Sequence, residues 1–440
     1  MAAIVAQGMP YTGTPMPSLL SPSLLFTYLF AAALVAGLLL KVWLASRQIR
    51  SVAQHQGEVP TAFAGHISLA AHQRAAGYTI AKTRLGLQEL AVSSAVLLGW
   101  TLLGGLNALN QALLGWLGGG MWQQLTLLAC FALIGGLIDL PLGWYKTFVV
   151  EQRWGFNQMT PGLWLSDLAK STLVGALIGL PLAALILWLM QAAGALWWLW
   201  AWGVLVAFNL VMMVVYPLWI APLFNRFQPL EDENLKSRIA ALMQRCGFKA
   251  SGFFVMDGSR RSAHANAYFT GLGRAKRVVF FDTLLKQLSP DEVQAVLAHE
   301  LGHFKHKHVL RRMVGLFVIS LLGFALLGWL ATRGWFYTGL GVQPNLTLDG
   351  SAPNNALALL LFMLALPVFT VFVTPLLAQL SRRDEFQADA YASAQASRND
   401  LRSALLKLYQ DNASTLTPDP VYASFYYSHP PASERLAHLA

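Results

Sequence analysis

Residues 289–308 read SPDEVQAVLAHELGHFKHKH and run directly into an apolar segment at 309–332. Ser289 is a favourable helix N-cap, a proline fits the first helical position, and Glu292 stands three residues after the cap, as in a capping box. A helix that begins there carries His299 and His303 one turn apart on the same face. The sequence therefore predicts a capped helix with two neighbouring imidazoles, joined end to end to a second, apolar helix.

The composition around this stretch is that of a membrane protein. Hydrophobic residues make up 55% of the 440 residues and charged residues only 12%, about half of the charged share usual in soluble proteins. Seven apolar runs are long enough to cross about 30 Å of hydrocarbon as helices. These runs are 22–44, 88–110, 122–147, 171–192, 196–220, 309–332 and 355–380. We expect a mainly α-helical, polytopic protein with about seven transmembrane helices.

Positive charges alternate between the loops that join these runs. Lys and Arg concentrate in loops 45–87 and 148–170 and in the tail 381–440, whereas loops 111–121 and 193–195 carry no charge. The positive-inside rule then places the N-terminus outside and both large polar segments in the cytoplasm. Because these loops account for the net charge of +10, we expect no nucleic-acid partner. The first 20 residues contain no Lys or Arg, which favours an N-terminal span over a cleaved signal peptide.

The two large polar segments are expected to form one small α/β unit on the cytoplasmic side. Its predicted elements are a helix at 234–246, strands at 253–256 and 277–281, and an edge strand or loop within 260–270. The chain then divides into an N-terminal membrane domain of about five spans, residues 1–220, and a second domain, residues 221–440. The second domain includes the last two spans.

His299, Glu300 and His303 form a His-Glu-x-x-His pattern, which is typical of zinc-dependent hydrolases. Two imidazoles on one helix face can bind one Zn²⁺, and the adjacent Glu300 can accept a proton from water at the open coordination position. One class of such enzymes has a further histidine that would fall at position 309, but Val309 occupies that position. The third ligand must therefore come from another segment.

A carboxylate pair after the last span can supply that ligand. Glu385 and Asp389 lie one helical turn apart, at the cytoplasmic end of the span. Glu385 can complete the ligand set, and Asp389 can accept a hydrogen bond from a liganding imidazole and so fix its orientation. We expect one Zn²⁺ per chain, bound by His299, His303 and Glu385.

An ordered set of motifs resembles those of the type I CAAX prenyl endopeptidases, a family of membrane-embedded gluzincins. The motifs are Val59-Pro60, EQRWGFN at 151–157, NAYFTG at 266–271, residues 278–284, the HELGH helix, SRRDEFQAD at 381–389 and SHPP at 428–431. The resemblance implies a small gluzincin-type zinc protease domain and a large water-filled chamber enclosed by the spans. It also implies that the chain hydrolyses peptide bonds of prenylated or membrane-associated proteins.

The same resemblance implies roles for three further residues. Asn266 and Ala267 match the edge strand that pairs with the substrate backbone, and an edge strand has free N–H and C=O groups for such pairing. His429 matches the late histidine that stabilises the oxyanion of the tetrahedral intermediate. The expected partners are thus a peptide or protein substrate, with or without a lipid, and the bilayer.

Two other functions stay open at the level of the residues. One is a quality-control membrane metalloprotease that acts on unprenylated substrates. The other is a non-catalytic membrane scaffold that keeps zinc only for structure, against which the intact Glu300 argues, because a structural site needs no base. The host membrane is a bacterial inner membrane or the endoplasmic reticulum, with the active site on the cytoplasmic side.

Several polar residues stand outside these motifs. His306 and His308 are expected to be interfacial or to support the ligands, with His306 closer to the zinc-facing side. Asp139 lies within the third span and should face a partner or a wet cavity, because a carboxylate is costly in hydrocarbon. Arg435 is expected to pair with a carboxylate near the site. The residues expected to be without a site role are His55, His66 and His72 on the surface, and Cys130 and Cys246, which cannot form a disulfide framework.

Overall fold

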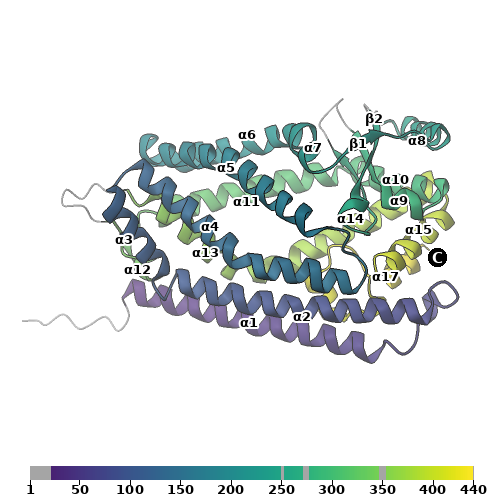
Figure 1. Cartoon of the computed structure of the whole chain (residues 1–440), viewed down its shortest axis with the longest axis horizontal. Coiled ribbons are helices and arrows are strands. Elements are labelled where there is room, and N and C mark those ends of the chain that lie inside the picture. The colour runs from purple at the N-terminus through teal and green to yellow at the C-terminus, as the bar shows by residue number, and fades with distance from the viewer. Residues whose placement is uncertain (1–20, 249–251, 271–276, 346–352, 440) are drawn as a thin grey trace, which may run out of the picture.

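The computed structural model describes residues 21–248, 252–270, 277–345 and 353–439. The expectations for the first 20 residues and for Gly271 of the NAYFTG motif lie outside the described residues. Long helices run along the length of the molecule, and a small sheet lies with shorter helices toward one end (Figure 1). The expected mainly α-helical fold with a small α/β unit is confirmed.

The helices of the described residues fall into a lengthwise set and a shorter set. The lengthwise set is α1 (Pro22–Gln54), α2 (Leu69–Trp100), α4 (Met121–Tyr145), α5 (Pro161–Ala192), α6 (Trp197–Val215), α11 (His308–Leu330), α13 (Asn355–Thr370) and α14 (Thr374–Gln395). The shorter set is α3 (Gly105–Leu117), α7 (Ala221–Phe224), α8 (Glu233–Arg245), α9 (Asp282–Gln287), α10 (Pro290–Lys305), α12 (Gly334–Thr338), α15 (Arg398–Asp411), α16 (Pro420–Tyr426) and α17 (Ala432–His438).

The number of membrane spans depends on one bent helix pair. Within the described residues, six helices are long and apolar enough to cross a membrane, and α2 with α3 makes a seventh if the pair counts as one span. The chain bends by 48° between α2 and α3. Gly104 has a φ of 78° there, which a side chain would disfavour. The sequence predicted an unbroken helix over 88–110, so the bend at 101–104 corrects that prediction.

Most of these helices expose their apolar side chains at the outer surface of the protein. In five of the six candidate spans, only 6–11% of the most apolar stretch is buried inside the protein. Such a surface suits lipid rather than water. The span that contains α13 is 39% buried, and Leu357 and Leu361 of α13 belong to the core between the membrane helices. α13 is therefore the central helix among the membrane helices.

Four strands form one sheet in the order β1-β2-β4-β3. The strands are β1 (Phe227–Pro229), β2 (Gly252–Met256), β3 (Ala267–Thr270) and β4 (Arg277–Phe281). β2 and β4 pair in parallel, whereas β1 and β3 pair antiparallel to their neighbours. The sequence did not predict β1, because three residues are too few for a periodic pattern. β3 lies at the edge of the sheet, which settles the choice between edge strand and loop.

α10 begins as its sequence predicts. The Ser289 hydroxyl accepts a hydrogen bond from the N–H of Glu292, and the Glu292 carboxylate accepts one from the N–H of Ser289 at 2.7 Å. The same carboxylate contacts Ser403 at 2.6 Å and Lys407 at 2.7 Å on α15. This one buried side chain therefore caps α10 and ties it to α15.

α10 packs most closely against α14, and Gly302 makes this possible. A Cβ atom at position 302 would lie 2.9 Å from the Cα of Ala388 and 3.1 Å from its carbonyl oxygen. Real Cβ atoms essentially never approach another backbone to 2.9 Å. The glycine of the HELGH motif thus lets the backbones of α10 and α14 approach each other.

One histidine of the first polar loop is not on the surface, contrary to the sequence prediction. His72 is fully buried, and its Nε2 lies 2.9 Å from the carbonyl oxygen of His55. It belongs to the first turn of α2, which packs against α1. His55 and His66 are exposed, as predicted.

Candidate metal centre and active site

The three predicted ligand residues meet where α10 faces α14. The Nε2 atoms of His299 and His303 are 3.2 Å apart, and the Glu385 carboxylate lies across from both, with Oε2 3.4 Å from His299 and Oε1 3.4 Å from His303. Ligand atoms about 2.0–2.1 Å from a tetrahedral zinc ion are about 3.3 Å from one another. The separations of the three side chains therefore match those around one tetrahedral ion.

The bonding of Glu385 is also that of a metal ligand. Its side chain is 3% exposed, and no hydrogen-bond donor of the described residues satisfies its Oε2 atom. The basic groups beside this oxygen are His299 Nε2 at 3.4 Å and Arg435 Nη1 at 4.0 Å. A buried carboxylate oxygen that accepts no hydrogen bond is costly, and a bound cation lowers this cost. Two imidazoles and one carboxylate are a donor set that catalytic zinc sites use. The residues present therefore fit a divalent metal such as zinc.

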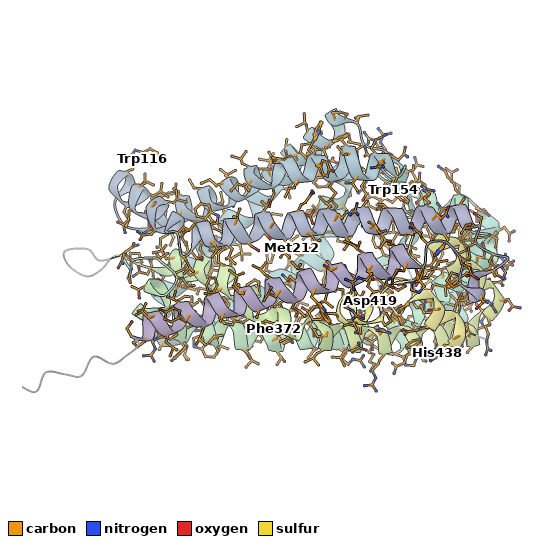
Figure 2. The ribbon with its side chains drawn as sticks, turned by 90° about the horizontal axis from the view of Figure 1, so that it is seen from below. Trp116, Trp154, Met212, Phe372, Asp419 and His438 are labelled. Atoms are coloured by element: carbon orange, nitrogen blue, oxygen red, sulfur yellow. The ribbon has the colours of Figure 1, made fainter. Side chains whose placement is uncertain are left out.

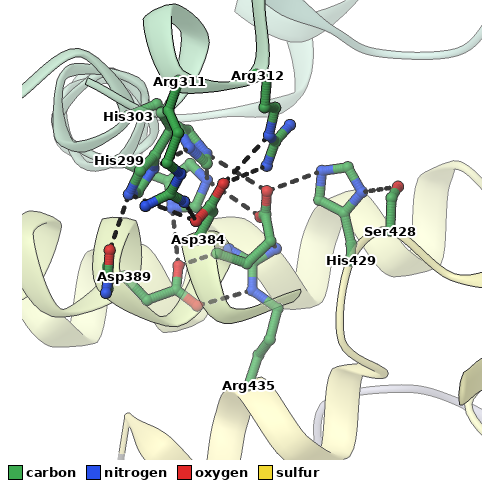
Figure 3. A network of polar contacts seen from close by, with 12 residues as sticks. His299, His303, Arg311, Arg312, Asp384, Asp389, Ser428, His429 and Arg435 are labelled. Atoms are coloured by element: carbon green, nitrogen blue, oxygen red, sulfur yellow. Dashed lines mark hydrogen bonds and ion pairs between the residues drawn. The ribbon is translucent and has the colours of Figure 1, made fainter. Parts of the chain in front are cut away.

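Asp389 and Arg435 support His299 from behind. Asp389 Oδ1 lies 2.8 Å from Nδ1 of His299 (Figure 3). The other ring nitrogen, Nε2, lies 3.4 Å from Glu385. Arg435 of α17 donates two hydrogen bonds to Asp389, at 2.8 and 2.6 Å. Burial opposes a charged imidazole, but Asp389 and Glu385 outweigh it and raise the pKa of metal-free His299 to about 9. The expected pairing of Arg435 with a carboxylate near the site is observed.

His308, and not His306, lies against His303, the second histidine of the predicted ligand set. Nδ1 of His308 is 3.0 Å from Nδ1 of His303, and its Nε2 is 2.9 Å from Oε1 of Gln387. His308 is buried, whereas His306 is exposed and stacks on His308 at 5.5 Å. Helical periodicity favoured His306, but α10 ends at Lys305, and Lys307 adopts a left-handed φ of 57° that turns the chain into α11. This turn brings His308 toward His303.

Asp384 connects α11 to α14 beside the ligands. Its carboxylate accepts hydrogen bonds from Arg311 and Arg312, with Arg312 donating at 3.0 and 3.1 Å (Figure 3). Asp384 is 3% exposed, so the two arginines neutralise a buried charge. Each of the two histidines is thus backed by a polar network, His299 through Asp389 and Arg435, and His303 through His308 and its neighbours.

Glu300 stands next to the ligand cluster on α10. Its side chain is half-buried, and burial raises the pKa of its carboxyl above the ordinary value. A general base works best when its pKa lies close to the working pH. The surroundings of Glu300 therefore suit proton transfer.

His429 lies in the loop between α16 and α17, on the open side of the cluster. Its Nε2 is 3.4 Å from Oε1 of Glu385, and its Nδ1 is 3.1 Å from the Ser428 hydroxyl (Figure 3). The side chain is 63% exposed and forms part of the wall of a cavity of about 1120 Å³. Asp139 lies on the same wall, so it faces a cavity as expected.

Within the described residues, one edge of β3 pairs with no strand, and the predicted substrate-binding residues Asn266 and Ala267 lie at its start. Ala267 begins β3, which pairs with β4 on one side. Asn266 precedes the strand, and its side-chain oxygen accepts a hydrogen bond from the N–H of Ala267 at 2.8 Å. Because this amide occupies the Ala267 N–H, an incoming strand would compete with the Asn266 side chain there.

Sequence reasoning missed a polar cluster that joins the two halves of the chain. Tyr78 of α2 donates to both oxygens of Glu151 at 2.8 Å, and Nε2 of His264 lies 3.8 Å from Glu151. Nδ1 of His264 is 3.2 Å from the Asn412 side-chain oxygen. The one feature of the sequence that pointed to this cluster is that Glu151 belongs to the EQRWGFN motif.

Comparisons with known proteins match both halves of the chain. A family model described as CAAX prenyl protease N-terminal, five membrane helices, matches residues 48–226, and a model for peptidase family M48 matches residues 229–440. A CAAX prenyl protease 1 homolog of Arabidopsis thaliana is 37% identical and aligns over 76% of this chain and 74% of its own. The CAAX prenyl protease 1 of Saccharomyces cerevisiae is 37% identical over 72% of either chain. The crystal structure of S. mikatae Ste24p has a TM-score of 0.87 and 30% identity, over 94% of this chain and 99% of that one.

Proposed function

This chain belongs to peptidase family M48, and we propose that it holds one Zn²⁺ on His299, His303 and Glu385 and cleaves membrane-associated protein substrates there. The family makes it a multi-pass membrane metalloendopeptidase. The observation that carries the ligand assignment is that the two imidazole Nε2 atoms lie 3.2 Å apart and each lies 3.4 Å from one of the two Glu385 oxygens, with Glu300 adjacent.

The chemistry follows from the position of each side chain. A zinc ion held by the three ligands would polarise the scissile carbonyl and acidify water. Glu300 accepts the proton of the attacking water and delivers it to the leaving amine. His429 donates a hydrogen bond to the oxyanion, and Asp389 holds His299 through Nδ1, which leaves Nε2 as the atom that would bind the metal. The substrate backbone pairs with the β3 edge at Asn266 and Ala267.

The substrate we propose is a prenylated protein. The relatives named CAAX prenyl proteases and the placement of the site beside membrane helices support this proposal. The membrane domain is assigned to residues 1–220 and the peptidase domain to residues 221–440, with the site on the cytoplasmic side of a bacterial inner membrane or of the endoplasmic reticulum. No nucleic-acid partner is part of the proposal.

A paired-peptide assay tests the function. The purified, zinc-loaded chain receives two peptides of one sequence, with and without a prenyl group on cysteine, and each reaction is repeated with a chelator. We expect cleavage of the prenylated peptide that stops with the chelator and returns with zinc.

Glu300→Gln is the matched variant, because it removes the base and keeps all three ligands. It should retain zinc and lose at least about a hundredfold in rate. Full activity in this variant would refute the role of Glu300. Equal cleavage of both peptides would instead support the quality-control function.

A further inference from the structure

The segment that leads into β3, residues 261–266, is joined to the EQRWGFN motif of the N-terminal, membrane-spanning half of the chain. Asn157, the last residue of the motif, forms an antiparallel bridge with Ser262. Beside this bridge, the N–H of Ala263 donates a hydrogen bond to the Phe156 carbonyl at 3.1 Å. The motif thus forms a short ladder with the chain that enters the proposed substrate-binding edge.

The motif is itself fixed to α2. Trp154 lies beside this helix (Figure 2). The Trp154 carbonyl accepts a hydrogen bond from Arg74 at 2.7 Å. Gly77 makes room for the indole, because a Cβ atom at this position would collide with the ring. The ladder partner of residues 261–266 is therefore anchored on a membrane helix.

Glu151, the first residue of the motif, extends this anchor through side chains. Tyr78 of α2 donates to both Glu151 oxygens at 2.8 Å, and the Glu151 carboxylate lies 3.8 Å from Nε2 of His264. The His264 ring stacks on Phe156 at 4.2 Å, with 11° between the planes. Lys82 adds a positive charge 4.9 Å over the Tyr78 ring. The imidazole of His264 is thus held on one face by an aromatic ring and at Nε2 by a carboxylate.

His264 in turn is tied to the backbone that precedes the strand edge. Its Nδ1 lies 3.2 Å from the Asn412 side-chain oxygen, which also accepts a hydrogen bond from the N–H of Ala265 at 3.1 Å. The carbonyl of Asn266 accepts a hydrogen bond from β4 at 3.0 Å. Successive residues of a strand direct their backbone groups to opposite sides, so Ala267 directs its own toward the side away from β4. The contacts of His264 therefore end three residues before the first backbone groups that a substrate strand would meet.

We propose that Glu151 is a positioning residue, which acts through His264 to hold the β3 edge in place for the substrate backbone. This inference rests on the proposed pairing of the substrate with Asn266 and Ala267. An edge that is already ordered binds a strand without a further loss of conformational entropy, whereas a loose edge must be ordered by the substrate itself. The metal ligands stand on other elements, α10 and α14. Loss of Glu151 should therefore weaken substrate binding and leave the metal site intact.

Glu151→Ala tests the proposal in the full-length chain that also carries Glu300→Gln. The binding of the prenylated peptide is measured by fluorescence anisotropy, zinc affinity by chelator competition, and folding by circular dichroism. We expect the Kd of the peptide to rise about fivefold or more and zinc affinity to stay within about twofold. With Glu300 intact, KM should rise by the same factor and kcat should change by less than about twofold, as expected for lost uniform binding.

Three variants accompany this test. Glu151→Gln keeps oxygen and nitrogen atoms in place for Tyr78 and His264, so it should retain most of the peptide affinity. Tyr78→Phe removes a single hydroxyl and should weaken peptide binding about twofold to threefold, which repeats the test with a smaller change should Glu151→Ala fold poorly. Glu58→Ala is the matched control, because Glu58 is an exposed carboxylate in the loop between α1 and α2, and it should bind the peptide as the unmodified chain does.

A double-variant cycle shows whether the effect passes through His264. Glu151→Ala combined with His264→Ala should weaken peptide binding no more than the stronger single change does. Multiplied effects would overturn the proposal, and so would unchanged peptide binding in Glu151→Ala and Tyr78→Phe. A fall in zinc affinity as large as the fall in peptide affinity would also overturn it, since Glu151 would then only stabilise the fold. If the Glu300→Gln chain itself bound no peptide, the proposed substrate pairing would fail together with this inference, a result distinct from the others.

Discussion

Gly302→Ala is the sharpest perturbation that the structure offers, because it adds one carbon atom between α10 and α14. That carbon would lie 2.9 Å from the Cα of Ala388, 3.1 Å from its carbonyl oxygen and 3.2 Å from the Cβ of Tyr391. Ordinary van der Waals contact begins at 3.4 Å. Two of the three contacts are with backbone, so no change of rotamer relieves them.

The magnitude follows from the required displacement. α10 and α14 must separate by about 0.5 Å, whereas the ligand distances of a metal site hold to about 0.2 Å. Overpacking of this kind costs about 1–3 kcal/mol, partly offset by roughly 1 kcal/mol from the better helix propensity of alanine. The displacement moves His299 and His303 away from Glu385. We therefore expect metal affinity to fall about tenfold to a hundredfold while the chain remains folded.

Zinc affinity is measured by competition with a chromophoric chelator, and folding by circular dichroism. Gly315→Ala on α11 is the matched control, because a Cβ atom there meets nothing within 4 Å. The control should bind zinc as the unmodified chain does. If Gly302→Ala bound zinc within twofold of the unmodified chain, the close approach of α10 and α14 would not position the ligands.

Three further predictions concern the groups around the site. Arg435→Gln should weaken zinc binding, because Asp389 loses two hydrogen bonds and no longer holds His299 firmly. We expect the zinc affinity, measured by chelator competition, to fall about tenfold or more. Zinc binding at pH 7.5 should release about one proton, because the pKa of metal-free His299 is about 9, and calorimetry in buffers of different ionisation enthalpy would detect it. Burial disfavours the charged form of Glu292, but Lys407, Ser403 and the N–H of Ser289 outweigh burial and lower the pKa of this carboxyl. The ionised Glu292 therefore stabilises the fold near neutral pH, and this stabilisation is lost on acidification. Glu292→Gln should therefore cost about 1–2 kcal/mol at pH 7 in denaturation experiments, and less below about pH 4.

The parts that the sequence predicted are those with local signals. Ser289 and Glu292 are a capping box, and His299 and His303 follow helical periodicity, so α10 could be placed with its imidazoles. The long apolar runs predicted the membrane helices, because the hydrocarbon thickness sets their length. Glu385 and Asp389 could be paired with the site because both stand at the end of a span that faces the same polar segment.

The parts that the sequence did not predict depend on contacts between distant segments or on a change of backbone direction. The role of His308 follows from the left-handed turn at Lys307, which periodicity ignores. The burial of His72 depends on how α2 packs against α1. The bend at Gly104 lies within an apolar run that reads as continuous. Likewise, the contact of Glu151 with His264 joins residues 113 positions apart in the sequence.

The distribution of the ligands over α10 and α14 has a consequence for biosynthesis. Glu385 follows His303 by 82 residues, and α11 and α13 lie between them. At about 5–20 residues per second, a ribosome adds Glu385 about 4–16 s after His303. Until then the growing polypeptide has two of the three ligands, and the third joins them only after α11 and α13 have entered the bilayer. With the proposed ligand set, metal acquisition would be timed to the end of membrane insertion, so a chain that stalls halfway would carry no reactive centre.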